Sequence, residues 1–306
     1  MESVTEPYRL LDGSPPAVGA EPADAAARAA DAAARAAGVS IREITDIRGF
    51  ESVCRLFDEI WRPDPQNPPV TAELLRALTK ADNYLAGAFD GDELVGACVG
   101  FFGPPSVATM HSHIAGVAPS VMRRSVGFAI KLHQRAWAMR RDVATISWTY
   151  DPLVSRNAYF NLVKLGALPA EYLANFYGGM NDGINGSDDS DRLLVSWELA
   201  APAVAAACAG TPAPRDAEVE LAAGAVVGLG RSDDGGPVAG TLSGGTVLVA
   251  VPRDIETLRS TDPGAAKEWR VAVREALSTL MNGGWRVAGF DKAGWYVLTR
   301  AGEETS

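Results

Sequence analysis

The order of secondary-structure elements predicted between residues 40 and 199 constrains the fold of this 306-residue chain most strongly. The segment YLAGAFDGDELVGACVGFF (84–102) indicates two strands around a turn at Asp90-Gly91-Asp92, and a third strand follows at Ala108–Val117. Helices and strands then alternate, so the whole order is β-α-α-β-β-β-α-β-α-β-β. Strands joined by short turns and followed by helical crossovers predict an α/β fold, with a mixed sheet and helices on both faces.

The remaining sequence predicts a tail, a connector and a second small unit. Residues 1–38 contain two successive ADAAARA repeats with almost no large apolar side chain, so we predict a flexible Ala-rich tail. A partner-binding helix is the alternative. Residues 39–200 form the predicted core, and residues 201–245 are an Ala/Gly-rich connector. Strand and helix patterns return in residues 246–306, which predict a smaller α/β C-terminal extension without a catalytic constellation.

Charge and cysteine content limit the partners that the chain can have. Asp plus Glu number 38 against 28 Lys plus Arg, a net charge of −10, which argues against a nucleic-acid partner. No stretch approaches the ~20 apolar residues of a membrane span, and the first residues lack the pattern of a secretory signal. We therefore expect a cytoplasmic protein with no membrane partner. The three cysteines are far apart and lack CxxC spacing, so we predict no metal.

The segment VAPSVMRRSVGFA (117–129) has the features of an anion-binding site. A predicted strand ends at Val117, a short loop carries Arg123 and Arg124, and a helix begins near Gly127. Loop amides and a helix N-terminus favour negative charge at one point, and the two guanidiniums add to this preference. Gly127 also lets a ligand approach the backbone closely. The alternative is an ordinary strand–helix turn with surface arginines.

Two motifs resemble those of the GCN5-related N-acetyltransferase (GNAT) superfamily. Arg124-Ser-Val-Gly127-Phe-Ala129 is similar to its acyl-CoA-binding signature, Arg/Gln-x-x-Gly-x-Gly/Ala, and Val117-Ala-Pro119 is similar to the preceding Val-x-Pro. NAYFNLVKLGA (157–167) resembles the second motif, and the order of predicted elements also matches that fold over residues 40–199. The resemblance implies a GNAT-like, mainly antiparallel sheet flanked by helices, in a bacterial branch that carries a C-terminal extension.

The chain departs from the superfamily pattern at three positions. Arg123 and Ser125 stand where Gly is common, although the loop amides remain. In the second motif, Leu162 stands where the superfamily usually has a Tyr that protonates the leaving thiolate. Tyr159, one helical turn earlier, is the candidate replacement for that Tyr; otherwise water protonates the thiolate.

The resemblance implies direct transfer of an acyl group from an acyl-CoA co-substrate, with acetyl-CoA as the default, to a primary amine of a small molecule or amino acid. The donor pyrophosphate would sit on the loop amides, and the backbone near Val117 would polarise the thioester carbonyl. To admit the pantetheine arm, the strand that ends at Val117 would splay from the strand at Ala144–Thr149. The expected donor-binding residues are Val117, Arg123, Arg124, Ser125, Val126, Gly127, Phe128, Ala129 and Asn157.

Two histidines are the candidate general bases for the attacking amine. His111 and His113 share one face of the strand at Ala108–Val117, because side chains alternate along a strand with period two. Neutral imidazole suits this role near pH 7, and we favour His113, which lies nearer the expected thioester. Asp151, just after the next strand, is the alternative base. The competing interpretations are one core and one exposed histidine, and an aspartate in a turn.

The loop at Phe176–Arg192 is expected to border the acceptor pocket, because it joins the last two core strands. Arg192 would suit a carboxylate of the acceptor. The alternative is a solvated acidic loop. The expected substrate-binding residues are Tyr177, Asn181, Asp182, Arg192 and Trp61. The competing functions are a non-catalytic CoA-binding module and a succinyl- or other acyl-CoA-dependent transferase, and a homodimer is compatible with the sequence.

Overall fold

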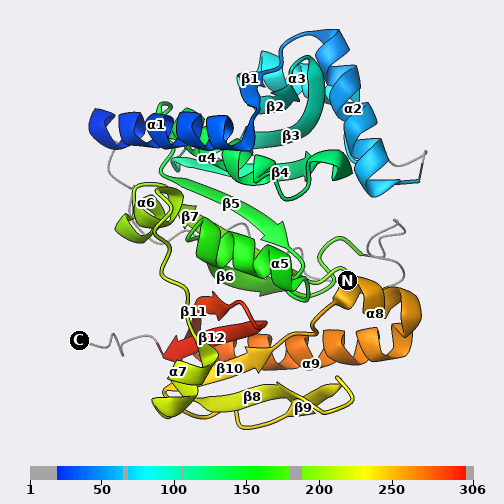
Figure 1. The fold of residues 1–306 in the computed structure, drawn as a ribbon, viewed down its shortest axis with the longest axis vertical. Helices are drawn as coiled ribbons and strands as arrows, with labels where there is room; N and C mark the ends of the chain where they lie inside the picture. The colour runs from blue at the N-terminus through cyan, green and yellow to red at the C-terminus, as the bar shows by residue number, and fades with distance from the viewer. Residues whose placement is uncertain (1–18, 65–67, 105, 179–187, 301–306) are drawn as a thin grey trace.

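The computed structural model describes residues 19–64, 68–104, 106–178 and 188–300, which form two sheets with flanking helices (Figure 1). The first sheet has seven strands in the order β1-β2-β3-β4-β5-β7-β6, and every neighbouring pair is antiparallel except β4 and β5. This confirms the predicted α/β class with a mixed, mainly antiparallel sheet. The strands are β1 (Ser40–Glu43), β2 (Tyr84–Asp90), β3 (Glu93–Phe102), β4 (Thr109–Val117), β5 (Thr145–Tyr150), β6 (Leu168–Leu173) and β7 (Arg192–Glu198).

Helices cover both faces of this sheet. A Cβ on Gly96 of β3 would lie 2.8 Å from the side chain of Ile130, and a Cβ on Gly116 of β4 would lie 2.6 Å from the ring of Trp61. Gly116 pairs with Ala97, the neighbour of Gly96, so the two glycines face opposite sides of the sheet. Small residues thus let the two helices approach the sheet. The helical segments of the core are α2 (Ile47–Trp61), α3 (Ala72–Lys80), η1 (Pro119–Val121), α4 (Val126–Met139), α5 (Ser155–Ala158) and the π-helical η2 (Tyr159–Lys164).

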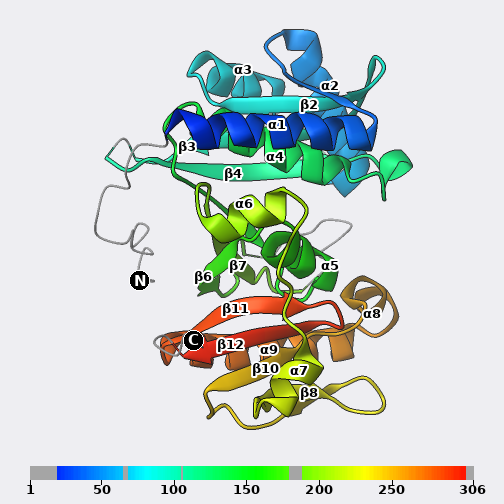
Figure 2. The same ribbon diagram turned by 60° about the vertical axis from the view of Figure 1, so that its left-hand side comes forward.

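The N-terminal helix differs from the sequence prediction. Residues Ala20–Ala37 form α1, which lies along α4 (Figure 2) and buries Ala23, Ala26, Ala30 and Ala37. The predicted flexible tail is therefore wrong for this segment, while residues 1–18 lie outside the described residues. The prediction treated a lack of large apolar side chains as an inability to pack. Alanines at helical spacing instead let two helix backbones approach closely.

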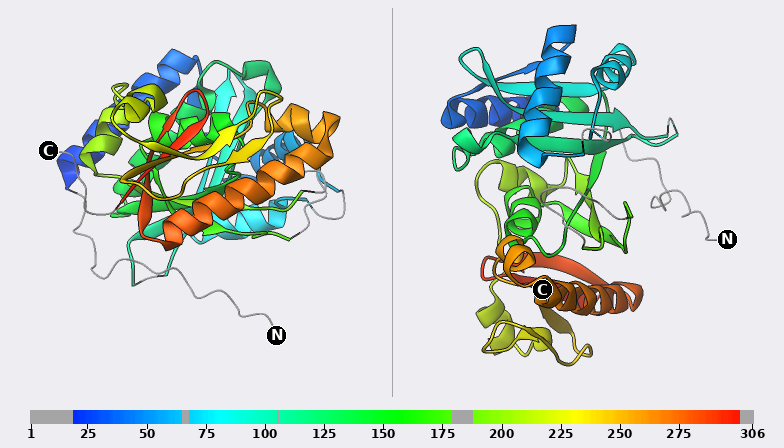
Figure 3. Two further views of the ribbon diagram at one scale, coloured as in Figure 1. Left: turned by 90° about the horizontal axis from the view of Figure 1, so that it is seen from below. Right: turned by 90° about the vertical axis from the view of Figure 1, so that its right-hand side faces the viewer.

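The C-terminal unit contains the second sheet, with five strands in the order β11-β12-β10-β8-β9, and the long helix α9 lies along it (Figure 3). Residues 201–245 differ from the predicted connector, because β8 pairs in parallel with β10 and so belongs to this sheet. No helix among the described residues is long and apolar enough to span a bilayer. The elements here are α6 (Pro202–Cys208), α7 (Ala217–Ala222), β8 (Val226–Arg231), β9 (Pro237–Ala239), β10 (Thr246–Ala250), α8 (Ile255–Thr261), α9 (Pro263–Asn282), β11 (Trp285–Asp291) and β12 (Trp295–Arg300).

Candidate active site

The parallel strands β4 and β5 pair over a short stretch and then diverge (Figure 1). Their pairing runs from Thr109 to His111 on β4, with His111 opposite Ser147 of β5, although β4 continues to Val117. Beyond His111, the backbone of β4 is therefore not paired with β5. The predicted splaying of these two strands is confirmed, and it leaves one edge of β4 open to an extended ligand.

A β-bulge lies in β4 beside this divergence. On the other edge of β4, Val99 pairs with Ile114 while Gly100 pairs with Ser112, so His113 is the extra residue. Bulges re-aim side chains and are common beside active sites. The bulge therefore distinguishes His113 from every other residue of the strand.

Both candidate histidines lie on the face of the sheet that α2 covers, together with Phe101. The ring centroids of His111 and His113 are 6.4 Å apart, and that of Phe101 lies 5.3 Å from the first and 5.9 Å from the second. Phe101 pairs with His111 across β3 and β4, which places their side chains on one face. The structure thus brings the two predicted base candidates together at the start of the divergence.

The two imidazoles differ in their surroundings. Burial, reinforced by the nearby His113 and Lys131, lowers the pKa of His111 to about 4, and its Nδ1 lies 3.4 Å from the Ser147 hydroxyl. His113 is exposed, and partial desolvation lowers its pKa below the usual value. Both rings are therefore neutral near pH 7. Of the two, the exposed His113 is the one that a substrate amine can reach.

The segment after β4 has the predicted strand–loop–helix form. The loop passes through η1 and then places Arg123 at φ 74° and Ser125 at φ 61°, and α4 begins at Val126. These left-handed values explain why glycine is suited to such positions. At Gly127, a Cβ would contact only Val117, at 3.6 Å, so the backbone there is open to a ligand. Amides at the start of α4 can therefore meet a phosphate directly.

The side chain of Arg124 has other partners than the predicted donor pyrophosphate. Its Nη1 lies 2.5 Å from Asp90 on β2, and its Nη2 donates to the carbonyl oxygens of Ala37 at 3.2 Å and Gly38 at 3.1 Å. The guanidinium thus holds the loop against the C-terminal end of α1, where carbonyl oxygens attract a cation. Arg123 is exposed and remains the candidate for phosphate contact.

Substitution of Ser125 by glycine should stabilise the loop. The left-handed conformation costs a residue with a Cβ about 1–2 kcal/mol, whereas the greater freedom of glycine in the unfolded chain costs about 0.4–1 kcal/mol. We expect Ser125→Gly to raise the free energy of unfolding in urea by about 0.5 kcal/mol. Ser120, which lies in η1 and has no positive φ, is the matched control: Ser120→Gly should lower the free energy of unfolding. Equal losses in both variants would contradict the strain assigned to Ser125.

The second motif forms the short helix α5 and the π-helical η2. Asn157 lies half-buried on α5, Tyr159 packs half-buried against the core, and Leu162 is buried. Sequence reasoning missed Asn161, whose side-chain oxygen accepts a bond of 3.2 Å from the indole of Trp148 on β5. The roles given to Asn157 and Tyr159 stay predictions, because the described contacts leave both side chains without a bond to the diverging strands.

Asp151 is not a free base, so the prediction that it is the alternative to His113 is wrong. Both its carboxylate oxygens lie 2.9 Å from the guanidinium of Arg270 on α9, and Arg259 of α8 approaches to 2.5 Å. Burial alone would raise the pKa of Asp151, but the two guanidiniums hold it well below its usual value. Asp151 is only 8 % exposed, so it anchors the C-terminal unit to the core.

The predicted acceptor residues lie in different surroundings. The hydroxyl of Tyr177 is 3.1 Å from that of Thr149 on β5, and Trp61 packs over Gly116 on the face that carries the histidines. Arg192 is predicted to bind a carboxylate of the acceptor from an accessible position. Its side chain is instead buried, and it donates to the carbonyl of Asp191 at 3.0 Å. Asn181 and Asp182 lie outside the described residues.

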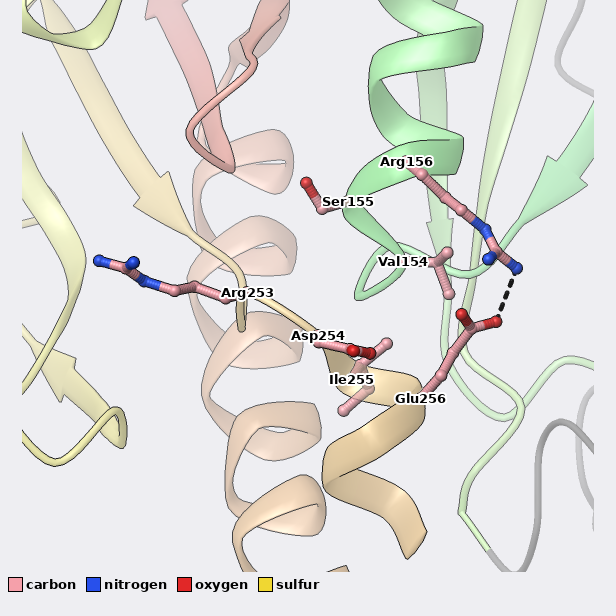
Figure 4. Close-up of a pocket in the computed structure, with 7 residues that line it drawn as sticks. All are labelled: Val154, Ser155, Arg156, Arg253, Asp254, Ile255 and Glu256. Atoms are coloured by element: carbon pink, nitrogen blue, oxygen red, sulfur yellow. Dashed lines mark hydrogen bonds and ion pairs between the residues drawn. The ribbon is translucent and has the colours of Figure 1, made fainter. Parts of the chain in front are cut away.

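A shallow cleft lies between the core and the C-terminal unit (Figure 4). It is lined by the start of α5 and the segment that leads into α8, and an ion pair of 2.7 Å between Arg156 and Glu256 crosses it. Arg253 points away from this pair in Figure 4. The cleft is a polar seam between the two units. It contains neither of the histidines.

Comparison with known proteins returns solved acetyltransferase structures. No protein-family model matches the sequence, and no curated protein matches it. The ribosomal-protein-S18-alanine N-acetyltransferase from Escherichia coli is 12 % identical, with a TM-score of 0.41 over 53 % of this chain and 94 % of that one. A GNAT-family acetyltransferase from Streptococcus pneumoniae is 12 % identical (TM-score 0.43; 52 % and 97 % covered), and IAA acetyltransferase from Bacillus cereus is 18 % identical (TM-score 0.40; 52 % and 99 % covered).

The core itself carries the features that the sequence motifs imply. Its mainly antiparallel sheet contains one parallel pair, β4 and β5, and this pair diverges beside a bulge. The loop after β4 leads into the helix that begins with the glycine-containing signature. The strand order, the diverging pair and the position of the signature are those that the resemblance implies for a GNAT-like fold.

Proposed function

We propose that this chain is an acyl-CoA-dependent N-acyltransferase, with acetyl-CoA the preferred donor, acting on a primary amine of a small molecule or amino acid. The observation that carries the proposal is the position of the bulged, exposed His113, just beyond the stretch of β4 that pairs with β5 and on the same strand that leads into the predicted anion-binding loop. A base and a phosphate site at two points of one open strand edge suit a long donor that ends in a reactive group.

The chemistry requires one bond to form and one to break. The amine attacks the thioester carbonyl, whose oxygen is polarised by the backbone of β4, and the C–S bond then breaks. His113 accepts the proton of the attacking amine, because its imidazole is neutral near pH 7 and exposed. Phe101 and the half-buried His111 restrict the ring of His113.

A non-catalytic CoA-binding module is the second candidate. The buried Leu162, at the position where the superfamily usually has a proton donor, favours it. An acceptor screen that follows thiol release from acetyl-CoA and succinyl-CoA separates the two functions. Donor binding without release above the rate of hydrolysis, across amino acids and small amines, would favour the module.

Donor binding is tested by adding one methyl group at Gly127. A Cβ there makes an ordinary contact of 3.6 Å with Val117, so Gly127→Ala should fold normally and gain helix propensity. The same methyl group would lie where a phosphate meets the α4 amides. Overpacking of this kind costs about 1–3 kcal/mol, so we expect calorimetry to show CoA affinity lowered about tenfold or more.

The matched control is Ser120→Gly in η1, outside the expected donor-binding residues, which should leave the affinity for CoA unchanged. Equal affinity in Gly127→Ala and the wild type would remove the phosphate from the start of α4. No binding of CoA to the wild type at millimolar concentration would contradict the transferase and the binding module alike.

A further inference from the structure

Lys131 of α4 is a buried cation that the proposed function does not use. It is 5 % exposed, and its Nζ lies 3.0 Å from the hydroxyl of Ser112, 2.7 Å from the side-chain oxygen of Gln134 and 3.8 Å above the ring of Trp148. Among the described residues, no carboxylate lies within ion-pair distance of it. An ammonium buried without a counter-ion is costly, so its retention calls for an explanation.

The ammonium lies where β4 and β5 separate. Ser112 directly follows His111, the last residue of β4 that pairs with β5, and Trp148 directly follows Ser147 on β5. Lys131 contacts both side chains from α4, so its Nζ lies on the α4 face of the sheet, over the point where the two strands separate. His111 and His113 lie on the opposite face of the sheet. A base and a buried cation therefore flank the same point.

The hydroxyl of Ser112 links the ammonium to the strand edge. An ammonium can only donate hydrogen bonds, so Ser112 Oγ is the acceptor in its contact with Lys131. The proton of Ser112 is then available to another acceptor, and the Cys98 thiol lies 3.6 Å from Oγ. This orientation suits a group that must hand a proton onward.

The charged state of Lys131 depends on few neighbours. Burial lowers its pKa to about 8, and the titratable groups nearby are Cys98 from β3 and His111 from β4. Burial raises the pKa of Cys98 and so keeps it a neutral thiol. The neighbours from β5 and β7, Trp148 and Trp197, do not titrate. Lys131 is consequently protonated at neutral pH and is a stronger acid than an ordinary lysine.

We infer that Lys131 and Ser112 protonate the leaving thiolate, in place of the tyrosine that this chain lacks at Leu162. The inference rests on the proposed acyltransferase function. When the C–S bond breaks, its electron pair goes to sulfur, Ser112 Oγ gives its proton to the sulfur, and Lys131 Nζ replaces that proton on Ser112. The neutral lysine then regains a proton from solvent, and His113 releases the proton of the amine.

The test is the pH dependence of kcat with acetyl-CoA and the acceptor found in the screen. The wild type should lose kcat above about pH 8, where Lys131 becomes neutral. Lys131→Met and Ser112→Ala should each lower kcat by about 10²-fold or more and abolish that alkaline limb, with the KM for acetyl-CoA within about threefold. Ser112→Thr keeps a hydroxyl and should retain most of the rate. Lys80→Met, at an exposed lysine of α3, is the matched control and should change nothing.

Several results would overturn the inference while leaving the proposed function intact. One such result is a kcat of Lys131→Met or Ser112→Ala within about threefold of the wild type, and another is a slower variant that still loses kcat at alkaline pH. A third is a Lys131→Met protein that thermal unfolding shows to be folded but that no longer binds acetyl-CoA. A wild type that binds the donor and acylates no amine contradicts the proposed function itself, and with it this inference.

Discussion

Replacement of Asp151 by alanine is expected to lower the free energy of unfolding by about 3–5 kcal/mol, because the buried guanidiniums of Arg259 and Arg270 then keep only one of the two carboxylates that they share, that of Asp188. Arg270 is 1 % exposed and holds both oxygens of Asp151 at 2.9 Å, and Arg259 shares the same carboxylate. The backbone amide of Leu153 also loses its acceptor, which lies 2.9 Å away. Chemical denaturation monitored by tryptophan fluorescence measures the loss.

Two further variants separate this effect from a general sensitivity of the region. Asp189 pairs with Arg274 of the same helix but is 50 % exposed, so Asp189→Ala should cost less than about 1 kcal/mol. The combination of Asp151→Leu with Arg270→Met removes both charges and should recover much of the lost stability. A loss of less than about 1 kcal/mol in Asp151→Ala would show that the ion pair does not hold the two units together.

The same ion pair predicts a pH dependence with a definite sign. The folded protein holds the pKa of Asp151 below its unfolded value, which is about 3.9. The stability that the pair contributes is therefore fully present above about pH 4 and is lost as the pH falls through the lower, folded pKa. The difference in stability between the wild type and Asp151→Ala should shrink below about pH 4 and stay constant between pH 5 and 8.

Local patterns in the sequence were sufficient for the parts of the site that depend on neighbouring residues. The loop between Val117 and Gly127 follows from a strand, two arginines and a glycine before a helix, and the structure has that form. The shared face of His111 and His113 follows from strand periodicity, and both rings lie near Phe101. Such features are set by the chain within a few residues, so the sequence expresses them directly.

Features that depend on distant contacts were missed or misassigned. Asp151 looked like a base after a strand because its partner Arg270 is 119 residues away in the chain. The bulge at His113 depends on which residues of β3 it faces, and alternation along β4 does not reveal it. Lys131 lies in an apolar helix and is buried only because Ser112, Gln134 and Trp148 surround it. Tertiary partners of this kind leave little trace in one sequence.

Replacement of His113 by glutamine is expected to lower kcat by about 10²–10⁴-fold, the range found for removal of a general base. Glutamine retains a polar side chain of similar length but cannot accept the proton of the amine near pH 7. Donor binding should be unchanged, because the start of α4 lies apart from the bulge. His133→Gln is the matched control: that ring bonds to the hydroxyl of Tyr84, at 2.9 Å, and should be needless for turnover.

The pH dependence of the wild-type rate on the acidic side tests the role of His113 independently. A base acts only when neutral, and partial desolvation places the pKa of His113 below 6.5. kcat/KM should therefore hold constant as the pH falls from 7 and decline only below about 6.5, and His113→Gln should lack that decline. His111, whose pKa is about 4, would instead place the decline near pH 4. A decline near pH 4 that persists in His113→Gln would assign the base to the half-buried His111 in place of the exposed His113, and the bulge would then be a feature of β4 without a part in proton transfer.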